Sequence, residues 1–249
     1  MNLSIASYAF HGLLAQGMID GFGYLETCKF RYHLHTADIW NGMLPFTDDD
    51  HLKKVKAALE ERELELVNLC VDGAHIWEDD PAQREKNYQN ALAHLHAAEV
   101  LGAKTIRIDA GVRADNFTNE QFDWIVKRFK EYAQRAFDNG YKVGPENHWG
   151  AEVNPENMKR ICQAVDKPAF GVLLHFRGND GDAVMAPWAM HTHISWDMTM
   201  GNLEGTMTML KNTGYKGAWS VEHHSAKDEY NNVSIQLAKV RGILQGWGA

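Results

Sequence analysis

The chain has 249 residues, of which 45% are hydrophobic, and its 33 acidic and 25 basic residues give a formal net charge of −8. This length suits one large domain over residues 1–249, and the acidic balance disfavours nucleic acids and anionic membranes as partners. No apolar run is long enough to span a bilayer, and the first residues lack the basic start and apolar core of a signal peptide. We therefore expect a cytoplasmic globular protein.

Three cysteines, Cys28, Cys70 and Cys162, lie far apart in the sequence. An odd and sparse set is poor material for a disulfide framework. We expect three buried, reduced thiols, which agrees with a cytoplasmic location.

The first half of the chain alternates between short apolar runs, which predict strands, and amphipathic segments, which predict helices. In chain order we expect a strand at 3–10, a poorly patterned helix at 20–32, a strand at 36–40, a helix from 47, a strand at 64–71, a helix from 80 to 102 and a strand at 104–109. Pro81 in the first turn and Gly102 at the end delimit the longest of these helices.

The second half continues the alternation. We expect helices at 118–139, 154–165, 203–212 and 229–244, and strands at 141–145, 169–174, 189–195 and 217–221. The Gly- and Asp-rich segment 177–187 predicts a loop with little helix. About eight β–α units predict an α/β protein whose parallel strands close into a single (β/α)8 TIM barrel. A doubly wound open sheet is the alternative, although no Gly-x-Gly-x-x-Gly follows the first strand.

Ionisable side chains mark the ends of four successive predicted strands. They are Glu146 with His148, then His175, then His191 with His193, and finally Glu222. Residues two apart on a strand point to the same face, so Glu146 and His148 can enter one site. The carboxyl ends of barrel strands form the face that carries active sites.

These residues form a candidate metal-ligand set of Glu146, His175, one of His191 or His193, and Glu222. Two carboxylates with two imidazoles suit one divalent ion, which we expect to be Mn²⁺, with Co²⁺, Fe²⁺ or Zn²⁺ as alternatives. Mg²⁺ fits less well because it prefers oxygen ligands. A metal beside two glutamates can polarise a sugar carbonyl while a glutamate moves a proton at the adjacent carbon. This is the chemistry of isomerisation and epimerisation.

Four segments carry a family resemblance. They are 101–109, the Pro-Glu-Asn-His-Trp-Gly run at 145–150, the His-x-His pair at 191–193, and 214–222, a glycine-flanked last strand that ends in glutamate. Together they resemble the xylose isomerase-like barrel superfamily, which includes sugar phosphate isomerases and epimerases, endonuclease IV and inosose dehydratase. The resemblance implies a metal-dependent enzyme on a single barrel.

By this resemblance, Glu146 and Glu222 are both metal ligands and the acid/base pair, and His193 rather than His191 binds the metal. The family's sixth-strand ligand is usually Asp, whereas this chain has His175. The ligand set therefore has one negative charge fewer and one nitrogen donor more than the usual set of the family. This departure favours a different metal or a different reaction from a simple isomerase.

Further residues fall at the same end of the predicted barrel. We expect His148 to support the ligands or to act as a base. We expect the substrate to contact His191, Asp109, Trp40, His11 and Trp149, and we place Trp188 and Trp196 at the same rim. Aromatic side chains there suit stacking on a sugar or a flat aglycone, and ordinary packing is the alternative for each tryptophan.

The leading function is isomerisation or epimerisation of a sugar or sugar-like molecule. The second is elimination on a 3-keto sugar, as in the bacterial C-glycoside deglycosidases, whose similar barrels work with a small partner subunit. An endonuclease IV-like activity needs a multi-zinc site and a basic groove, which this acidic chain does not indicate. A non-enzymatic sugar-binding subunit requires the ligand set to be incidental. We expect an oligomer, either of identical chains or with a small partner subunit.

Overall fold

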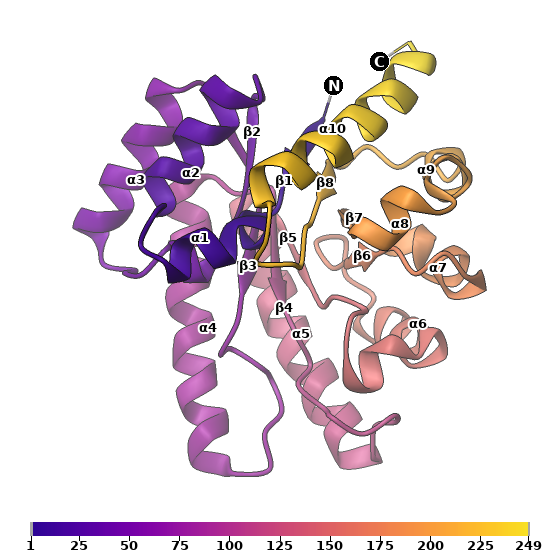
Figure 1. Ribbon diagram of the computed structural model, residues 1–249. Coiled ribbons are helices and arrows are strands. Elements are labelled where there is room, and N and C mark those ends of the chain that lie inside the picture. Colours follow the sequence, from indigo (N-terminus) through magenta and orange to yellow (C-terminus); the bar gives the residue numbers. More distant parts are fainter. Residues whose placement is uncertain (1, 249) are drawn as a thin grey trace.

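Eight parallel strands occupy the centre of the computed structural model, which describes residues 2–248, and helices surround them (Figure 1). The strands are β1 (Leu3–Ile5), β2 (Thr36–Trp40), β3 (Glu65–Val71), β4 (Thr105–Ile108), β5 (Lys142–Gly144), β6 (Val172–His175), β7 (Ala189–Ile194) and β8 (Trp219–Val221). The helices are α1 (His11–Ala15), α2 (Gly21–Glu26), α3 (Asp49–Glu61), α4 (Pro81–Leu101), α5 (Asn119–Asn139), α6 (Pro155–Val165), α7 (Asp180–Met185), α8 (Trp196–Met200), α9 (Leu203–Asn212) and α10 (Glu229–Gly246). Short 3₁₀ or π turns occur at Ser7–Phe10, Thr27–Arg31, Asn41–Met43, Gly150–Val153 and Ala186–Trp188.

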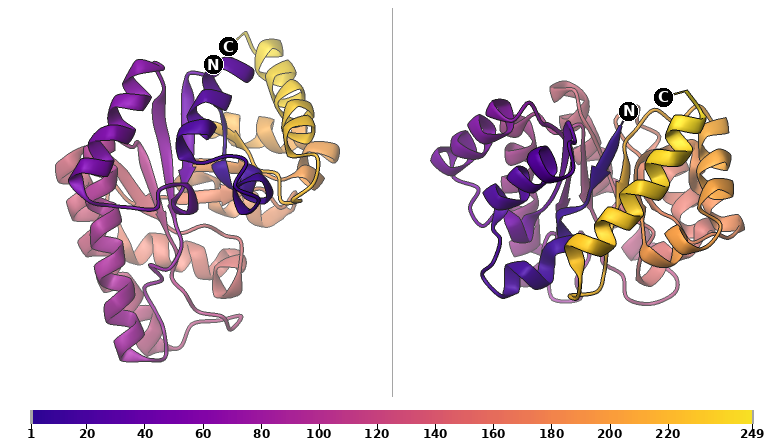
Figure 2. Two further views of the ribbon diagram at one scale, coloured as in Figure 1. Left: turned by 60° about the vertical axis from the view of Figure 1, so that its left-hand side comes forward. Right: turned by 45° about the horizontal axis from the view of Figure 1, so that its top comes forward.

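The strands pair in two parallel runs, β1–β8–β7–β6 and β2–β3–β4–β5. Backbone bridges join the runs at both edges, between Ala6 and Asp38 and between Val143 and Phe170. The sheet therefore closes on itself, which confirms the predicted (β/α)8 barrel. Two further views show the helices packed around the outside of the strands (Figure 2).

Local sequence signals place the two longest helices, which extend below the strands in Figure 1. Asp80 caps α4 by accepting a hydrogen bond from the backbone of Ala82, and Thr118 forms a capping box with Gln121 at the start of α5. Both helices end at a left-handed glycine. Because helices follow strands in this fold, both helices begin on the side of the barrel where the strands end.

Three local expectations were wrong. The first strand ends at Ile5, because the chain turns into 3₁₀ helix and α1 before residue 10. The expected loop at 177–187 contains α7, which begins where the side chain of Asn179 accepts a hydrogen bond from the backbone of Gly181. Trp188 directly precedes β7, so it lies at the opposite end of the barrel from the carboxyl ends of the strands.

The three cysteines are buried and unbridged, as expected. Within residues 2–248, no helix combines the length and apolar character that a membrane crossing needs.

Gly144 lets β5 and β6 approach closely. A Cβ atom at this position would lie 1.7 Å from the carbonyl oxygen of Gly171. We expect Gly144→Ala to lower the free energy of unfolding by about 3 kcal/mol or more, because the backbone at the closure of the barrel must move. Gly242→Ala in α10 is the matched control, since its Cβ meets nothing within 4 Å, and it should stabilise the helix by about 0.5–1 kcal/mol. Urea unfolding measures both, and equal midpoints would contradict a tight contact here.

Candidate active site

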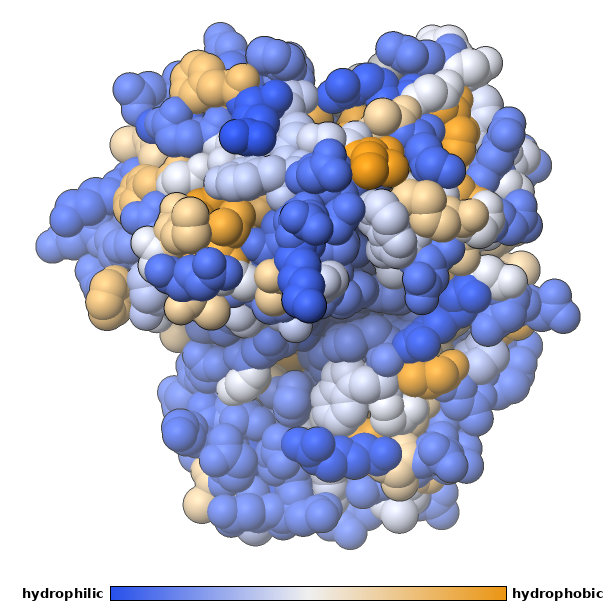
Figure 3. Space-filling view, in the orientation of Figure 1, coloured by the Kyte–Doolittle hydropathy of each residue, from blue (hydrophilic) through white to orange (hydrophobic). Residues whose placement is uncertain are grey.

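A pocket of about 210 Å³ opens at the carboxyl ends of the strands. Side chains from around the whole barrel line it: Tyr8, Asp38, Trp40, Cys70, Asp72, Arg107, Glu146, His148, His175, His193, Glu222 and His224. The space-filling view is hollowed near the middle of one face, with mostly hydrophilic residues around the hollow (Figure 3). Drug-sized ligands usually occupy about 300–1,000 Å³, so this pocket suits one small molecule.

The barrel brings Glu146, His175, His193 and Glu222 together, with one ligand atom of each within 4.8 Å of the others. Nδ1 of His175 and Nδ1 of His193 each lie 3.1 Å from Oε1 of Glu146. The same two nitrogens lie 3.5 and 3.4 Å from Oε2 of Glu222. Each residue sits on or just after a different strand, so the closure of the barrel produces the cluster.

Both glutamates are ionised despite their burial. Burial alone would raise the pKa of Glu146, but His148 and His193 outweigh it and hold that pKa well below its usual range. Burial likewise opposes the charge on Glu222, and His193 and His224 lower its pKa to about 2. Two adjacent carboxylates that are ionised at neutral pH repel each other and attract a cation between them.

His193 lies between these carboxylates and Asp38. Burial lowers its pKa, but Glu222 and Glu146 together raise it well above the usual range. Its Nε2 lies 3.1 Å from Oδ2 of Asp38, on the side away from the cluster. The pKa of Asp38 is far below its usual range, because His191 and His193 outweigh the effect of its burial. Protonation of His193 and binding of a cation therefore compete for the same carboxylates.

The donor set fits a divalent transition metal. Two carboxylates neutralise a doubly charged ion, and two imidazole nitrogens supply borderline-soft donors that suit Mn²⁺, Fe²⁺, Co²⁺ or Zn²⁺. His193 also has the arrangement common to metal-binding histidines, in which the second ring nitrogen contacts a carboxylate, here that of Asp38. Glu146, His175, His193 and Glu222 are therefore the residues that can hold a metal here.

Arg107 on β4 is a buried cation beside the cluster. Its Nη1 donates to Asp72 and to Asp109, each at 2.9 Å, and its Nε lies 3.4 Å from Oε2 of Glu146. Asp109 also accepts a hydrogen bond from the backbone N–H of Glu146 and another from the indole of Trp149. Arg107 and Asp109 thus fix the segment that carries Glu146.

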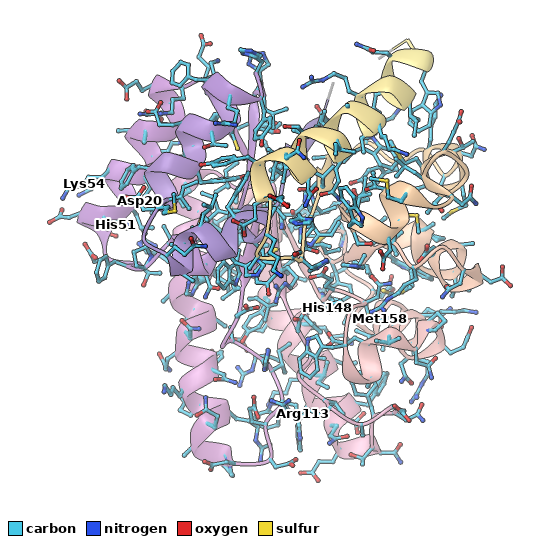
Figure 4. All side chains as sticks on the ribbon, in the orientation of Figure 1. Asp20, His51, Lys54, Arg113, His148 and Met158 are labelled. Carbon is cyan, nitrogen blue, oxygen red and sulfur yellow. The ribbon has the colours of Figure 1, made fainter. Side chains whose placement is uncertain are left out.

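His148 lines the pocket beside Glu146, with Nδ1 3.3 Å from Oε2 of that glutamate. In Figure 4 it lies near the middle of the molecule, well above Arg113. His224 lies beside the other glutamate, with Nε2 3.1 Å from Oε2 of Glu222, and this contact raises its pKa. Each glutamate therefore has a partly exposed histidine next to it.

The structure places only one of the five residues predicted to contact substrate in the lining of the pocket. Trp40 lines the pocket, whereas His11 stacks on Tyr8 with ring centroids 4.4 Å apart and lies outside the lining. Asp109 and His191 lie outside the lining, with 0% and 1% of their surface exposed, so neither presents surface to a substrate in the pocket. Trp149 packs against His75, also outside the lining.

Seven pocket residues were not among the predicted site residues: Ala6, Tyr8, Asp38, Cys70, Asp72, Arg107 and His224. Arg107 had a detectable signal, because a charged residue in the apolar strand Thr105–Ile108 must either face the barrel interior or disrupt the packing of the helices. Asp72 and His224 lie one or more residues beyond their strands, where strand alternation no longer gives a direction.

Residues 21–240 match the sequence model of a protein family that is described as xylose isomerase-like TIM barrel. Among solved structures, the IolI protein with a bound zinc atom has a TM-score of 0.77 and 15% identity, covering 99% of both chains. A D-tagatose 3-epimerase-like protein has a TM-score of 0.75 and 16% identity, also over 99% of both chains. The probable 3-DHS dehydratase AsbF from Bacillus anthracis has a TM-score of 0.70 and 14% identity, covering 97% of this chain and 98% of that one. The sequence matches no curated protein closely enough to indicate a relative.

Proposed function

The chain belongs to the xylose isomerase-like TIM barrel family, and from this premise we propose that it is a metal-dependent enzyme that abstracts a proton beside the carbonyl of a small sugar or sugar-like substrate. The product is an isomer or an epimer. The observation that carries the proposal is the convergence of Glu146, His175, His193 and Glu222 in the pocket. Structural neighbours described as a D-tagatose 3-epimerase-like protein and a D-psicose 3-epimerase support this class of reaction.

A divalent ion held by these four residues would polarise the carbonyl and so acidify the adjacent C–H bond. We propose Mn²⁺ first, with Co²⁺, Fe²⁺ or Zn²⁺ as alternatives, because two of the four donors are nitrogens. A structural neighbour with zinc and another with magnesium support a divalent ion without selecting one.

Glu146 and Glu222 transfer the proton in this proposal. Both are ionised, and both lie in the pocket, so either carboxylate can accept a proton from the carbon next to the carbonyl. Return of the proton to the neighbouring carbon gives an isomer, and return to the opposite face of the same carbon gives an epimer. His148, next to Glu146, is placed to exchange the proton between substrate oxygens.

The charges of the pocket favour a neutral substrate. Four carboxylates line it: Asp38, Asp72, Glu146 and Glu222. Arg107 and a divalent ion together supply three positive charges against these four negative ones. Asp72 is about half exposed and offers an acceptor to sugar hydroxyls, while Trp40 and Tyr8 offer aromatic surface. A phosphorylated sugar would meet no excess of positive charge here, even with His224 protonated beside Glu222.

Elimination is the second candidate, because the same carbanion can expel a substituent from the next carbon. A dehydratase among the structural neighbours supports this outcome, and the 3-keto glycosides of C-glycoside deglycosidases are one such substrate class. In that case a small partner subunit is expected alongside the barrel.

His175→Asp tests the ligand set at the position where the chain departs from the family pattern. We expect the variant to keep a bound metal but to shift its preference from Zn²⁺ towards Mn²⁺ and Mg²⁺, because a nitrogen donor is replaced by a charged oxygen donor. Competition between these ions for the purified protein measures the preference. Complete loss of metal binding by a folded variant would show that residue 175 is not a shared ligand position.

The reaction itself is tested with a panel of neutral keto-sugars, their phosphate esters, and 3-keto C- and O-glycosides. We expect turnover of a neutral member, and the product distinguishes isomerisation from elimination. Failure of the metal-loaded protein to transform any member, together with undiminished binding of a sugar after chelation, would favour a sugar-binding role instead.

A further inference from the structure

Asp38 on β2 lies at the floor of the pocket, directly behind the candidate ligand His193. Its side chain is completely buried. Oδ2 accepts hydrogen bonds from Nε2 of His191 at 2.8 Å, from Nε2 of His193 at 3.1 Å and from Oγ of Ser220 at 2.7 Å. Oδ1 accepts another from Nδ2 of Asn68 at 2.8 Å. Four hydrogen bonds from three other strands hold this carboxylate in one orientation.

The bond to His193 determines what that imidazole presents to the pocket. A neutral imidazole carries its proton on one nitrogen only, and the other nitrogen keeps a lone pair. Because Asp38 is an acceptor on the Nε2 side, the proton belongs on Nε2. Nδ1 lies 3.1 Å from Oε1 of Glu146 and 3.4 Å from Oε2 of Glu222, and it would donate its lone pair to a metal ion that takes the place of the proton these carboxylates hold there.

We propose that Asp38 is a positioning residue that fixes the ring orientation and the tautomer of His193, so that Nδ1 faces the metal. This inference rests on the proposed metal centre and assigns a role to a residue that contacts the metal only through His193. His191 is assigned the supporting role of keeping Oδ2 in place.

A second metal ion at Asp38, His191 and His193 is the main alternative, since these three residues also lie within 4.8 Å of one another. The hydrogen bonds argue against it. Oδ2, the oxygen that faces both histidines, already has three donors, so it has no free direction for an ion. The three side chains are also at most 1% exposed. They therefore support the site above them.

Asp38→Asn is the decisive variant. The amide oxygen is expected to stay with Asn68, which places the new NH₂ group where Oδ2 was, facing Nε2 of His193. Two donors then oppose each other, and the ring relieves the conflict by giving up the proton on Nε2 and keeping the one on Nδ1. We expect the affinity for Co²⁺, measured in competition with a coloured chelator, to fall by about 10- to 100-fold. The ¹⁵N spectrum of the apoprotein should show His193 with protons on both nitrogens in the wild type, because the two glutamates hold one on Nδ1, and as the Nδ1–H tautomer without a proton on Nε2 in Asp38→Asn.

Ser220→Ala is the matched control, because it removes one hydrogen bond to the same oxygen without placing a donor opposite His193. It should leave the tautomer unchanged and the Co²⁺ affinity close to that of the wild type. A purely structural role for Asp38 would lower the thermal stability of both variants and leave the tautomer as it was.

The outcomes separate this inference from the proposed function. An unchanged tautomer and unchanged Co²⁺ affinity in folded Asp38→Asn would overturn the positioning role, as would two tightly bound Co²⁺ ions per wild-type chain. A wild-type protein that binds no Co²⁺ would overturn the metal centre, and the role proposed for Asp38 with it. Loss of affinity with the tautomer shift, in a protein that binds one ion, supports both.

Discussion

Glu146→Gln should reduce turnover of the sugar identified in the substrate panel by about 10³-fold or more, with the fold intact. Glutamine has the same shape as glutamate, but it is a weaker metal ligand and cannot accept a proton from carbon. The variant also leaves Arg107 and His193 with one carboxylate fewer. Turnover should be measured at saturating metal, so that weaker metal binding is separated from loss of the base.

Glu152→Gln is the control for this variant. Glu152 is a buried carboxyl outside the pocket lining, and burial together with the nearby Asp109 raises its pKa well above the usual range. Its neutral form is therefore favoured, and glutamine matches the shape of a neutral carboxyl. Its turnover should match that of the wild type. Near-normal turnover by Glu146→Gln itself would remove Glu146 from the chemistry.

Arg107→Met should lower the free energy of unfolding by about 3–5 kcal/mol, because it leaves buried carboxylates without their cation. Asp109 has no exposed surface, and Glu146 is 2% exposed, so water cannot replace the guanidinium at either. Methionine fills most of the space of the arginine stem. Urea unfolding of the purified variant gives the loss directly.

The control for Arg107→Met is Arg135→Met on the outer surface. Arg135 pairs with Glu99 through two hydrogen bonds, but both side chains are partly exposed. Its loss should cost about 1 kcal/mol or less, because solvent screens the remaining charge. Equal destabilisation by the two variants would contradict the claim that burial of its carboxylate partners makes Arg107 more important for stability than a surface arginine.

The barrel and the candidate metal cluster could be predicted from sequence because both follow from strand periodicity. The alternation of apolar runs and helical segments placed the strands, and Glu146, His175, His193 and Glu222 stand at the ends of four of them. In a parallel barrel those ends must meet. The short helix α7 was missed because its glycine and aspartates suggested a loop, whereas Asn179 and the acidic first turn start a helix there.

The position of each side chain along the barrel axis could not be predicted in the same way. His191 and His193 share a face, as expected, but they are separated by about 6–7 Å along the strand, so His193 reaches the cluster and His191 bonds to Asp38 below it. The role of Arg107 depends on Asp72 and Glu146, which come from other segments, as well as on Asp109 two residues further along the chain. No pattern within one strand indicates which charges its neighbours will present.

The central claim, a catalytic divalent ion held by Glu146, His175, His193 and Glu222, is tested most directly by the metal content of the purified protein, with turnover measured before and after chelation. The account predicts about one Mn, Co, Fe or Zn per chain, loss of turnover on chelation, and recovery when the ion is returned. A protein that carries no metal, and whose turnover neither falls with chelator nor rises with added ion, would contradict it.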